Sequence, residues 1–471
     1  MAHDPSFDPA HMHTFTPAME ALAGEVIAYT FERFAMNPPP LDGPLRPDQL
    51  DALTGPTVTP DGLGGTEALR LWVEVLAPAC ISQDHPRALS FVPSAPTEAS
   101  ALFDLVVGAS SIYGGSWLEG SGAVHAENQA LRWIADLAGL PASAGGCFVS
   151  GGSAGNLSAL VAARHAAAEA RAAAGLERPA RWCIAASAEA HSSIASTARV
   201  MDIDVIDAPV DDRGRLTGAA LAATLAGLDG TEAMDGLFAI VATGGTTNAG
   251  IVDDLAGVAD VAAERDLWLH VDGAYGGAAL AAPSARAHFD GIERVDSLVI
   301  DPHKWLFTPF DCAALLYRRP ELAKAAHTQH AAYLDVLHDH DSASGEWNPS
   351  DYAYHLTRRA RGLPLWFSLA THGTDAYRNA VEASLDVTQA GADLIRSLDH
   401  VELVIEPMLS VLLFRRLGWE PDDYRAWSDR ALAEGLTLTV PTSWQGETVL
   451  RFCIVNPRTT VDDLAVILAT L

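Results

Sequence analysis

The sequence predicts an α/β protein in which a mostly parallel sheet forms a large domain and a smaller α+β domain follows it. Two observations carry this prediction. Between residues 145 and 319, short apolar segments alternate with helical ones, which is the pattern of a parallel sheet covered by helices on both faces. From about residue 380 the pattern changes to one helix, three strand-like segments and a final helix.

The part of the chain before the large domain, residues 1–84, is expected to be mainly helical. Residues 15–36 carry apolar side chains at helical spacing, and Pro17 stands near their start, where a helix does not use the missing N–H. Residues 37–65 are rich in Pro and Gly and are expected to be an extended connector, and 65–78 are expected to be another helix.

The large domain, residues 85–378, is expected to open with two helical stretches within 95–138. Six short apolar runs are then expected to be buried strands, namely GCFVSG, RWCIAAS, LFAIVATGG, LWLHVDGAYG, VDSLVID and CAALLYRR. An Ala-rich helix at 159–174 and an amphipathic helix in VDDLAGVADVAAERD are expected between them. The polar segment 325–357 is long enough for a loop with a role of its own, such as a lid.

The C-terminal domain is expected to comprise residues 379–471. A helix near 379–397 leads to three strand-like segments, VELVIEP, SVLLFRR and ETVLRFCIV. Thr459 and Thr460 are expected to cap a final helix, because a threonine hydroxyl accepts a hydrogen bond from a free N–H of the first helical turn.

Composition limits the possible partners. The 471 residues carry a net charge of -30, so nucleic acid and anionic membranes are unfavourable partners. The N-terminus lacks the pattern of a signal peptide, and no stretch of about 18 apolar residues that could span a membrane is present. Five scattered cysteines lack metal-site and disulfide spacing, so we expect reduced thiols, a cytoplasmic protein and no metal.

A glycine-rich turn around Ser153 opens a helix and allows two interpretations. Gly151, Ser153 and Gly155 match G-x-S-x-G, the pattern around the nucleophile of serine hydrolases. The same turn offers free N–H groups and the positive end of a helix dipole, to which a phosphate can bind. The hydrolase would need an upstream oxyanion segment such as HGGG, and the sequence has none, so phosphate binding is favoured.

Three further residues point to one kind of chemistry. Asp272 ends a buried strand, where a carboxylate needs a positive partner, and a protonated ring nitrogen would be one. Lys304, one of only two lysines, follows another strand and lies between His303 and Trp305, where a desolvated amine could form an imine. His191 follows a third strand. Lysine, aspartate, a flat side chain and a phosphate site together predict pyridoxal phosphate as the cofactor.

The motifs resemble those of the group II pyridoxal-phosphate-dependent amino acid decarboxylases, which include aromatic-L-amino-acid and glutamate decarboxylases. The segments that carry the resemblance are SGGSAGNLSAL, AHSS, GGTTNAGIVDDL, HVDGAYGG and DPHKW, in family order, most clearly between about 85 and 320. The resemblance implies a fold-type I large domain. It also implies a homodimer with the active site at the subunit interface and with residues 1–84 packed across it.

The resemblance also implies roles for individual residues. Lys304 is similar to the Schiff-base lysine, Asp272 to the partner of the ring nitrogen, and His191 to the residue stacked on the ring. The other positions similar to cofactor-binding ones are Gly152, Ser153, Thr247, His270 and His303. Ser94 resembles a substrate-side residue, as does His191.

The resemblance implies decarboxylation of an L-amino acid to its amine and CO2. A loop tyrosine of the neighbouring subunit often protonates Cα in the family, and Tyr352, with Tyr354 second, stands in the matching segment. His191 stays a candidate proton donor. Relatives without the tyrosine can release an aldehyde with O2, so this outcome and carbon–sulfur lysis remain alternatives. A non-catalytic protein is a further, remote one.

Two departures concern the substrate and the phosphate. His125 and Glu127 stand where the aromatic decarboxylases carry a proline and two acidic residues. This departure is a point against an aromatic substrate. No cationic motif points to a distal carboxylate, so a hydrophobic or aromatic amino acid is favoured. Asp301 stands where some relatives have Asn, and a carboxylate would repel a phosphate beside it.

Overall fold

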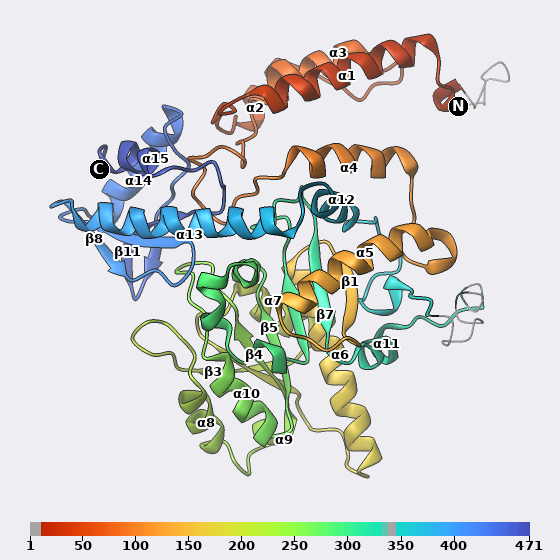
Figure 1. Cartoon of the computed structure of the whole chain (residues 1–471), viewed down its shortest axis with the longest axis vertical. Helices are drawn as coiled ribbons and strands as arrows, with labels where there is room; N and C mark the ends of the chain where they lie inside the picture. Colours follow the sequence, from red (N-terminus) through yellow and green to blue (C-terminus); the bar gives the residue numbers. More distant parts are fainter. Residues whose placement is uncertain (1–10, 333, 335–336, 338–344) are drawn as a thin grey trace.

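A computed structural model describes residues 11–332, 334, 337 and 345–471 and contains a central seven-stranded sheet (Figure 1). The strand order is β1-β7-β6-β5-β4-β2-β3, and only β7 runs antiparallel to its neighbours. The strands are β1 (Gly145–Val149), β2 (Cys183–Ser187), β3 (Asp204–Ala208), β4 (Leu237–Thr243), β5 (Trp268–Asp272), β6 (Ser297–Ile300) and β7 (Ala313–Tyr317). The mostly parallel α/β fold is therefore confirmed.

Helices cover both faces of this sheet. They are α5 (Trp117–Leu137), α6 (Gly152–Ala173), α7 (Ser192–Met201), α8 (Gly218–Ala226), α9 (Glu232–Gly236), α10 (Leu255–Glu264), α11 (Pro320–His327) and α12 (Leu363–His372), and α4 (Glu98–Ser110) packs on α12. Alternate residues of β4 enter different cores, because successive side chains of a strand point to opposite faces. Ile240 packs in the core with α5, α8 and α10, and Val241 in the core with α6, α7 and α11.

One strand of the sheet is missing from the sequence-based prediction. β3, with the sequence DVIDA, lies at the edge of the sheet and is only partly buried. An edge strand needs no continuous apolar run, and this one carries two aspartates in five residues, so its pattern is weak. The other six predicted strands are confirmed as β1, β2, β4, β5, β6 and β7.

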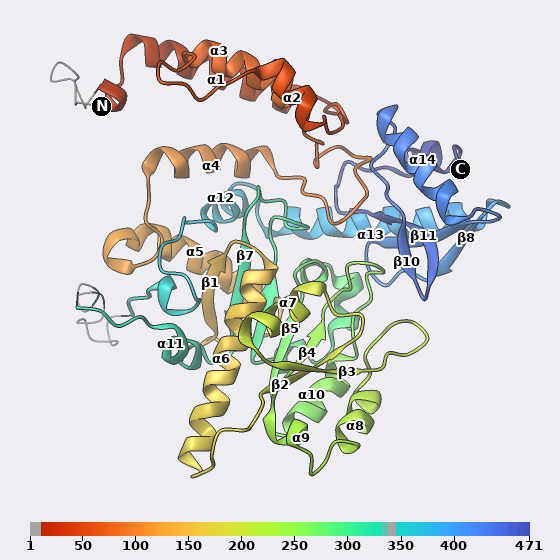
Figure 2. The ribbon, with the colours of Figure 1, turned by 180° about the vertical axis from the view of Figure 1, so that it is seen from behind.

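The N-terminal helices lie on the outside of the molecule, above α4 in Figures 1 and 2, and Arg33 pairs with Asp84 at 2.7 Å. They are α1 (Pro17–Ala35), α2 (Pro47–Thr54) and α3 (Gly65–Leu71), which a π-helical turn, Trp72–Leu76, extends. Thr16 caps α1 by accepting a hydrogen bond from the Met19 N–H. No side chain of α1 is buried, although the helix carries apolar residues at regular spacing.

The C-terminal part contains a four-stranded antiparallel sheet, β10-β11-β9-β8. Its elements are α13 (Thr374–Arg396), β8 (Val401–Ile405), β9 (Val411–Arg416), α14 (Pro421–Ala433), β10 (Thr442–Trp444), β11 (Glu447–Cys453) and α15 (Val461–Leu468). Thr460 caps α15 as expected. The proposed domain border at residue 379 falls inside α13, and the three domain boundaries stay predictions.

A buried ion pair joins α5 to the segment before α12. Arg358 and Glu127 are almost wholly buried and form two hydrogen bonds, of 2.8 and 3.1 Å. The Gly362 N–H also donates to Glu127, at 2.8 Å from Oε1. A charge left alone in such a place is expensive, because neither water nor a counter-ion reaches it.

We expect Glu127→Gln to lower the free energy of unfolding by about 3–5 kcal/mol, the cost of stranding the Arg358 charge. The matched control is Asp104→Asn, which breaks the half-exposed pair of Asp104 with Arg359 and is expected to cost about 1 kcal/mol or less. Urea denaturation of the two variants measures both values. Equal losses would contradict the account of Arg358.

The described helices include none that is both long and apolar enough to cross a membrane.

Candidate active site

The predicted site residues meet at one edge of the large sheet. β1, β2, β4, β5 and β6 all end there, because β1 and β6 both run antiparallel to β7 and are therefore parallel to each other. Loops after the carboxyl ends of parallel strands are where ligands bind in such sheets. A cavity of about 290 Å³ opens at this edge, and its walls include Gly152, Ser153, His191, Thr247, Asp272, Asp301, His303, Lys304, Phe310 and Asp311.

The turn between β1 and α6 brings the start of a long helix to the cavity. α6 begins at Gly152 without a side-chain cap, so the positive end of its dipole faces the cavity. A Cβ atom on Gly152 would lie 2.9 Å from Ala274 Cβ, so only glycine allows this close approach. Ser153 is exposed at the cavity wall.

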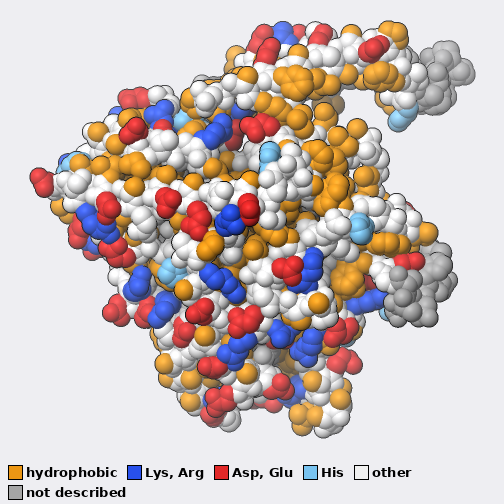
Figure 3. Space-filling model, in the orientation of Figure 1, with side chains coloured by type: hydrophobic (Ala, Val, Ile, Leu, Met, Phe, Trp, Pro, Cys, Tyr) orange, Lys and Arg blue, Asp and Glu red, His pale blue; other side chains and the backbone are white. Residues whose placement is uncertain are grey.

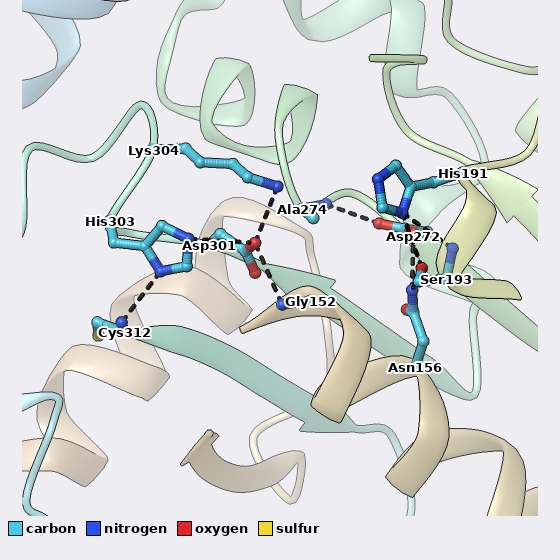
Figure 4. A network of polar contacts seen from close by, with 10 residues as sticks. All are labelled: Gly152, Asn156, His191, Ser193, Asp272, Ala274, Asp301, His303, Lys304 and Cys312. Atoms are coloured by element: carbon cyan, nitrogen blue, oxygen red, sulfur yellow. Dashed lines mark hydrogen bonds and ion pairs between the residues drawn. The ribbon is translucent and has the colours of Figure 1, made fainter. Parts of the chain in front are cut away.

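Asp272 is held as a carboxylate acceptor at the end of β5 (Figure 4). Oδ1 accepts the Ala274 N–H at 3.1 Å, and Oδ2 accepts Asn156 Nδ2–H at 2.8 Å. Both bonds orient the carboxylate of a side chain that is only 6% exposed. Asp272 is therefore prepared to hold a cation that enters the cavity.

The bond to Asp272 fixes the hydrogen bonds behind it. Asn156 must present Nδ2 to the carboxylate, so its Oδ1 accepts from His270 Nε2 at 2.9 Å. His270 Nδ1 then accepts from the hydroxyl of Ser297 at 2.8 Å. Burial lowers the pKa of His270 to about 4, which keeps the imidazole neutral. His270 thus lies behind Asp272, and it orients Asn156 and Asp272 without lining the cavity.

Because the pKa of His270 is about 4 in the folded protein and about 6.5 when unfolded, the unfolded chain takes up a proton first as the pH falls. Stability is therefore expected to be lost between pH 6.5 and 4, by about 1–2 kcal/mol at pH 5 from this residue. Denaturation at pH 7 and pH 5 measures the loss. His270→Gln should reduce it, and the exposed control His372→Gln should not.

His191 lines the cavity at the start of α7, on the same side as Asp272 and Ser193 in Figure 4. Its Nδ1 accepts the Ser193 N–H at 3.2 Å, so the neutral ring carries its proton on Nε2. Ser193 Oγ also contacts Nδ1, at 2.9 Å, and accepts from Asn156. These bonds orient the His191 ring and link it to the Asp272 network. They also join His191 to Ser193 and not to Ser153, the nucleophile of the hydrolase interpretation.

Lys304 and His303 enter from the loop between β6 and β7. Burial favours the neutral Lys304 amine, but the Asp301 carboxylate outweighs it at 3.0 Å and raises the pKa of Lys304 above its ordinary value. His303 Nδ1 accepts the Cys312 N–H at 3.0 Å, and burial lowers the pKa of His303. The cavity thus holds one fixed cation, Lys304, between two carboxylates.

Ser94 and the two candidate tyrosines do not line this cavity, and neither does His270, which lies behind Asp272. Ser94 donates to the Thr308 carbonyl and lines a separate groove of about 420 Å³ beside the N-terminal helices. Tyr352 is buried, and its ring stacks on Trp347 at 4.1 Å. Tyr354 is exposed. The segment proposed as a lid, 325–357, lies partly outside the described residues, so that role stays a prediction.

Three site residues were not predicted from the sequence: Asn156, Ser193 and Ser297. Asn156 had a usable signal, because it stands four residues after Gly152 on an otherwise Ala-rich helix and so shares its face. A fully buried amide on such a face needs partners, and these are Asp272, His270 and Ser193.

These groups fit pyridoxal phosphate. Lys304 offers an amine and Asp272 a carboxylate for the ring nitrogen, while His191 offers a flat ring and the start of α6 an anion site. When bound, the cofactor supplies a ring that accepts the electrons of a broken bond at Cα. A cavity with these groups defines an enzyme that uses this cofactor.

Comparison with known proteins agrees with the site. The family model described as the pyridoxal-dependent decarboxylase conserved domain matches residues 69–417. The aromatic-L-amino-acid decarboxylase of Bacillus atrophaeus is 29% identical over 391 residues, 81% of this chain and 79% of that protein. The L-2,4-diaminobutyrate decarboxylase of Rhizobium meliloti (strain 1021) is 31% identical over 388 residues, 80% and 75% of the two chains.

The crystal structure of Oryza sativa TDC with PLP and tryptamine is 26% identical and has a TM-score of 0.85, covering 100% of this chain and 98% of that one. The chain belongs to the pyridoxal-dependent decarboxylase family and is a pyridoxal-phosphate-dependent amino acid decarboxylase. The family and cofactor predicted from the motifs are confirmed.

Proposed function

We propose that the protein decarboxylates a hydrophobic or aromatic L-amino acid to its amine. Lys304 attaches the cofactor, Asp272 holds a proton on the ring nitrogen, and His191 covers the ring. Gly152, Ser153, Thr247 and His303 surround the cofactor, with His270 behind Asp272. The observation that supports these roles is their convergence on one cavity at the strand ends, with His270 bonded through Asn156.

The preference for an apolar substrate is supported by the surroundings of Phe310. This side chain is 57% exposed and lines both the cofactor cavity and the groove beside the N-terminal helices. The groove also contains Tyr29, Phe34 and Trp72. A substrate side chain that leaves the cavity past Phe310 would enter this groove, where contact with its aromatic residues favours an aromatic or aliphatic group, although Arg33, Asp84, Glu98 and Arg458 also line it.

The substrate test is mass spectrometry of the products formed from a pool of L-amino acids, in air, with pyridoxal phosphate. The pool includes aromatic, aliphatic and acidic members and L-2,4-diaminobutyrate. An amine derived from an aromatic or aliphatic member supports the proposal, and Phe310→Ala should then raise KM for that substrate. An amine derived only from diaminobutyrate or an acidic member would overturn the substrate class, and an aldehyde would overturn the amine product.

We also propose that the protein works as a homodimer in which the N-terminal helices of each copy are covered by the other copy. α1 has no buried side chain, and hydrophobic side chains gather where these helices face the rest of the molecule (Figure 3). The exposed apolar residues are Met19, Val26, Ile27 and Phe31 of α1 and Leu102, Leu105 and Val106 of α4. Apolar surface of this extent is typical of an interface. A monomer at micromolar concentration in light scattering would contradict the proposal.

The loop tyrosine stays part of the proposal, with Tyr352 first and Tyr354 second. Tyr352 is buried and its ring stacks on Trp347, so it has a packing role in its own subunit. If it protonates Cα in the second copy, Tyr352→Phe will shift the product from amine to aldehyde while the fold is kept. An unchanged product ratio in both Tyr352→Phe and Tyr354→Phe would remove the two tyrosines from this role.

The free state of all five cysteines supports a reducing compartment such as the cytoplasm.

A further inference from the structure

Asp301 occupies the place where the start of α6 meets the cavity. Its Oδ2 accepts the Gly152 N–H at 3.2 Å and lies 3.0 Å from Lys304 Nζ and 3.6 Å from His303 Nε2 (Figure 4). The N–H groups at the start of a helix are those that bind a phosphate. The carboxylate therefore already uses a donor of the anion site.

The second carboxylate oxygen of Asp301 has no hydrogen-bond partner among the described residues, and it is fully buried. A Cβ atom added to Gly152 would lie 3.1 Å from Oδ2 and 3.3 Å from Oδ1, so both oxygens face the start of α6. Asp301 itself is only 2% exposed. A buried charged oxygen without a donor is costly, and the side chain that carries it lines the cavity at the start of α6.

The charges around Asp301 do not favour a second anion. The titratable groups that line the cavity are His191, Asp272, Tyr275, Asp301, His303, Lys304 and Asp311, and burial raises the pKa of Tyr275, which keeps its hydroxyl neutral. Lys304 is the one fixed cation among them, and burial lowers the pKa of His303, so this imidazole adds little positive charge. A phosphate monoester carries about two negative charges near pH 7. Two buried anions at contact distance cannot both stay ionised, and the cheapest change is to protonate one.

We propose that Asp301 binds the cofactor's phosphate as the neutral acid, so that one proton is taken up from solvent when the cofactor binds. Oδ2 keeps the Gly152 N–H, Lys304 leaves its pair with Asp301 when its amine attaches the cofactor, and the acid proton of Asp301 is donated to a phosphate oxygen. No covalent bond changes in this step. Asp301 thereby makes cofactor affinity depend on pH, and it competes with the phosphate when the pH is high.

The test compares the dissociation constants of pyridoxal phosphate and of pyridoxal, which lacks the phosphate, between pH 6 and 8.5. Both are measured by fluorescence titration of the protein freed of cofactor. Asp301→Asn mimics the neutral acid, because its amide oxygen can accept from Gly152 while its amide nitrogen donates to the phosphate. Asp311→Asn, a carboxylate of the same cavity that pairs with Arg361, is the matched control.

The dissociation constant of pyridoxal phosphate is expected to rise more steeply with pH for the wild type than for Asp301→Asn. The difference between the two slopes is at most about tenfold per pH unit, which is the limit for one linked proton. At pH 8, Asp301→Asn should bind pyridoxal phosphate at least about tenfold more tightly than the wild type and bind pyridoxal about equally. Asp311→Asn should keep the wild-type slope. Parallel slopes for wild type and Asp301→Asn, or weaker binding of both ligands by Asp301→Asn, would overturn the proposal.

Calorimetry gives a second reading if Asp301→Asn is unstable. Titrations of the wild type at pH 8 in buffers of different ionisation enthalpy count the protons that enter with each ligand. One more proton is expected with pyridoxal phosphate than with pyridoxal after correction for the free phosphate, and no difference would overturn the proposal. Both experiments measure cofactor binding, so they stay independent of which amino acid is decarboxylated.

Discussion

Lys304→Ala is expected to retain no covalently bound cofactor and to lose at least about 10³-fold in kcat/KM, as expected for the loss of a residue that acts covalently. Lys304 is the lysine of the cavity, where Asp301 and Asp272 surround its amine with negative charge. The chain has only one other lysine, Lys324 of α11, whose Nζ lies 3.7 Å from Asp351 Oδ2. Lys324→Ala is therefore a complete control and should keep both properties.

Borohydride reduction followed by peptide mass mapping measures where the cofactor is attached. The account predicts the added mass on the peptide that contains Lys304 in the wild type and in Lys324→Ala. Attachment at Lys324, or activity that survives in Lys304→Ala, would show that the wrong lysine has been assigned.

Asp272→Asn has the second largest expected effect. Removing one partner of a buried charge pair costs about 3–5 kcal/mol, which is about 10²-fold to 5 × 10³-fold in kcat at about 1.36 kcal/mol per tenfold. The physical reason is that a neutral amide no longer holds a proton on the ring nitrogen, so the ring accepts electrons less well. In Asp272→Asn the amide oxygen can keep the bond from the Ala274 N–H, whereas the bond from Asn156 Nδ2 is lost, so some stability is lost as well.

Steady-state kinetics with the substrate from the product screen measures this loss. Absorbance of the bound cofactor adds an independent reading, because its pH dependence should change in Asp272→Asn. The control Asp260→Asn breaks an exposed pair with Arg294 and should keep the kinetics of the wild type. A rise in KM alone, with kcat unchanged, would contradict the role of Asp272 at the ring.

The sequence was sufficient for six of the seven strands of the large sheet, and it indicated which residues meet at one edge, because of one property of parallel sheets. Each motif residue stands at or shortly after the end of a strand, as Asp272 ends β5 and Lys304 lies in the loop after β6, and the carboxyl ends of parallel strands share one edge. The order of the strands was not needed for this conclusion.

The remaining parts depend on which faces touch, and a linear pattern does not contain that information. Asn156 reaches Asp272 only because α6 packs across β5 and β6, and Asp301 reaches Gly152 only because β1 and β6 flank β7. Ser94 was expected near the substrate but lies in the neighbouring groove, and the edge strand β3 lacks the apolar pattern of a buried strand. Tyr352 was chosen from its segment, and its stacking on Trp347 could not be derived there.

The central claim is that the cavity at the ends of β1, β5 and β6 is where the cofactor is held and used. A crystal structure with pyridoxal phosphate tests it most directly. The account predicts continuous density from Lys304 Nζ to the cofactor, the ring nitrogen in contact with Asp272, and the phosphate at the start of α6 beside Gly152 and Asp301. A cofactor with its phosphate elsewhere, or with its ring nitrogen away from Asp272, would contradict the account.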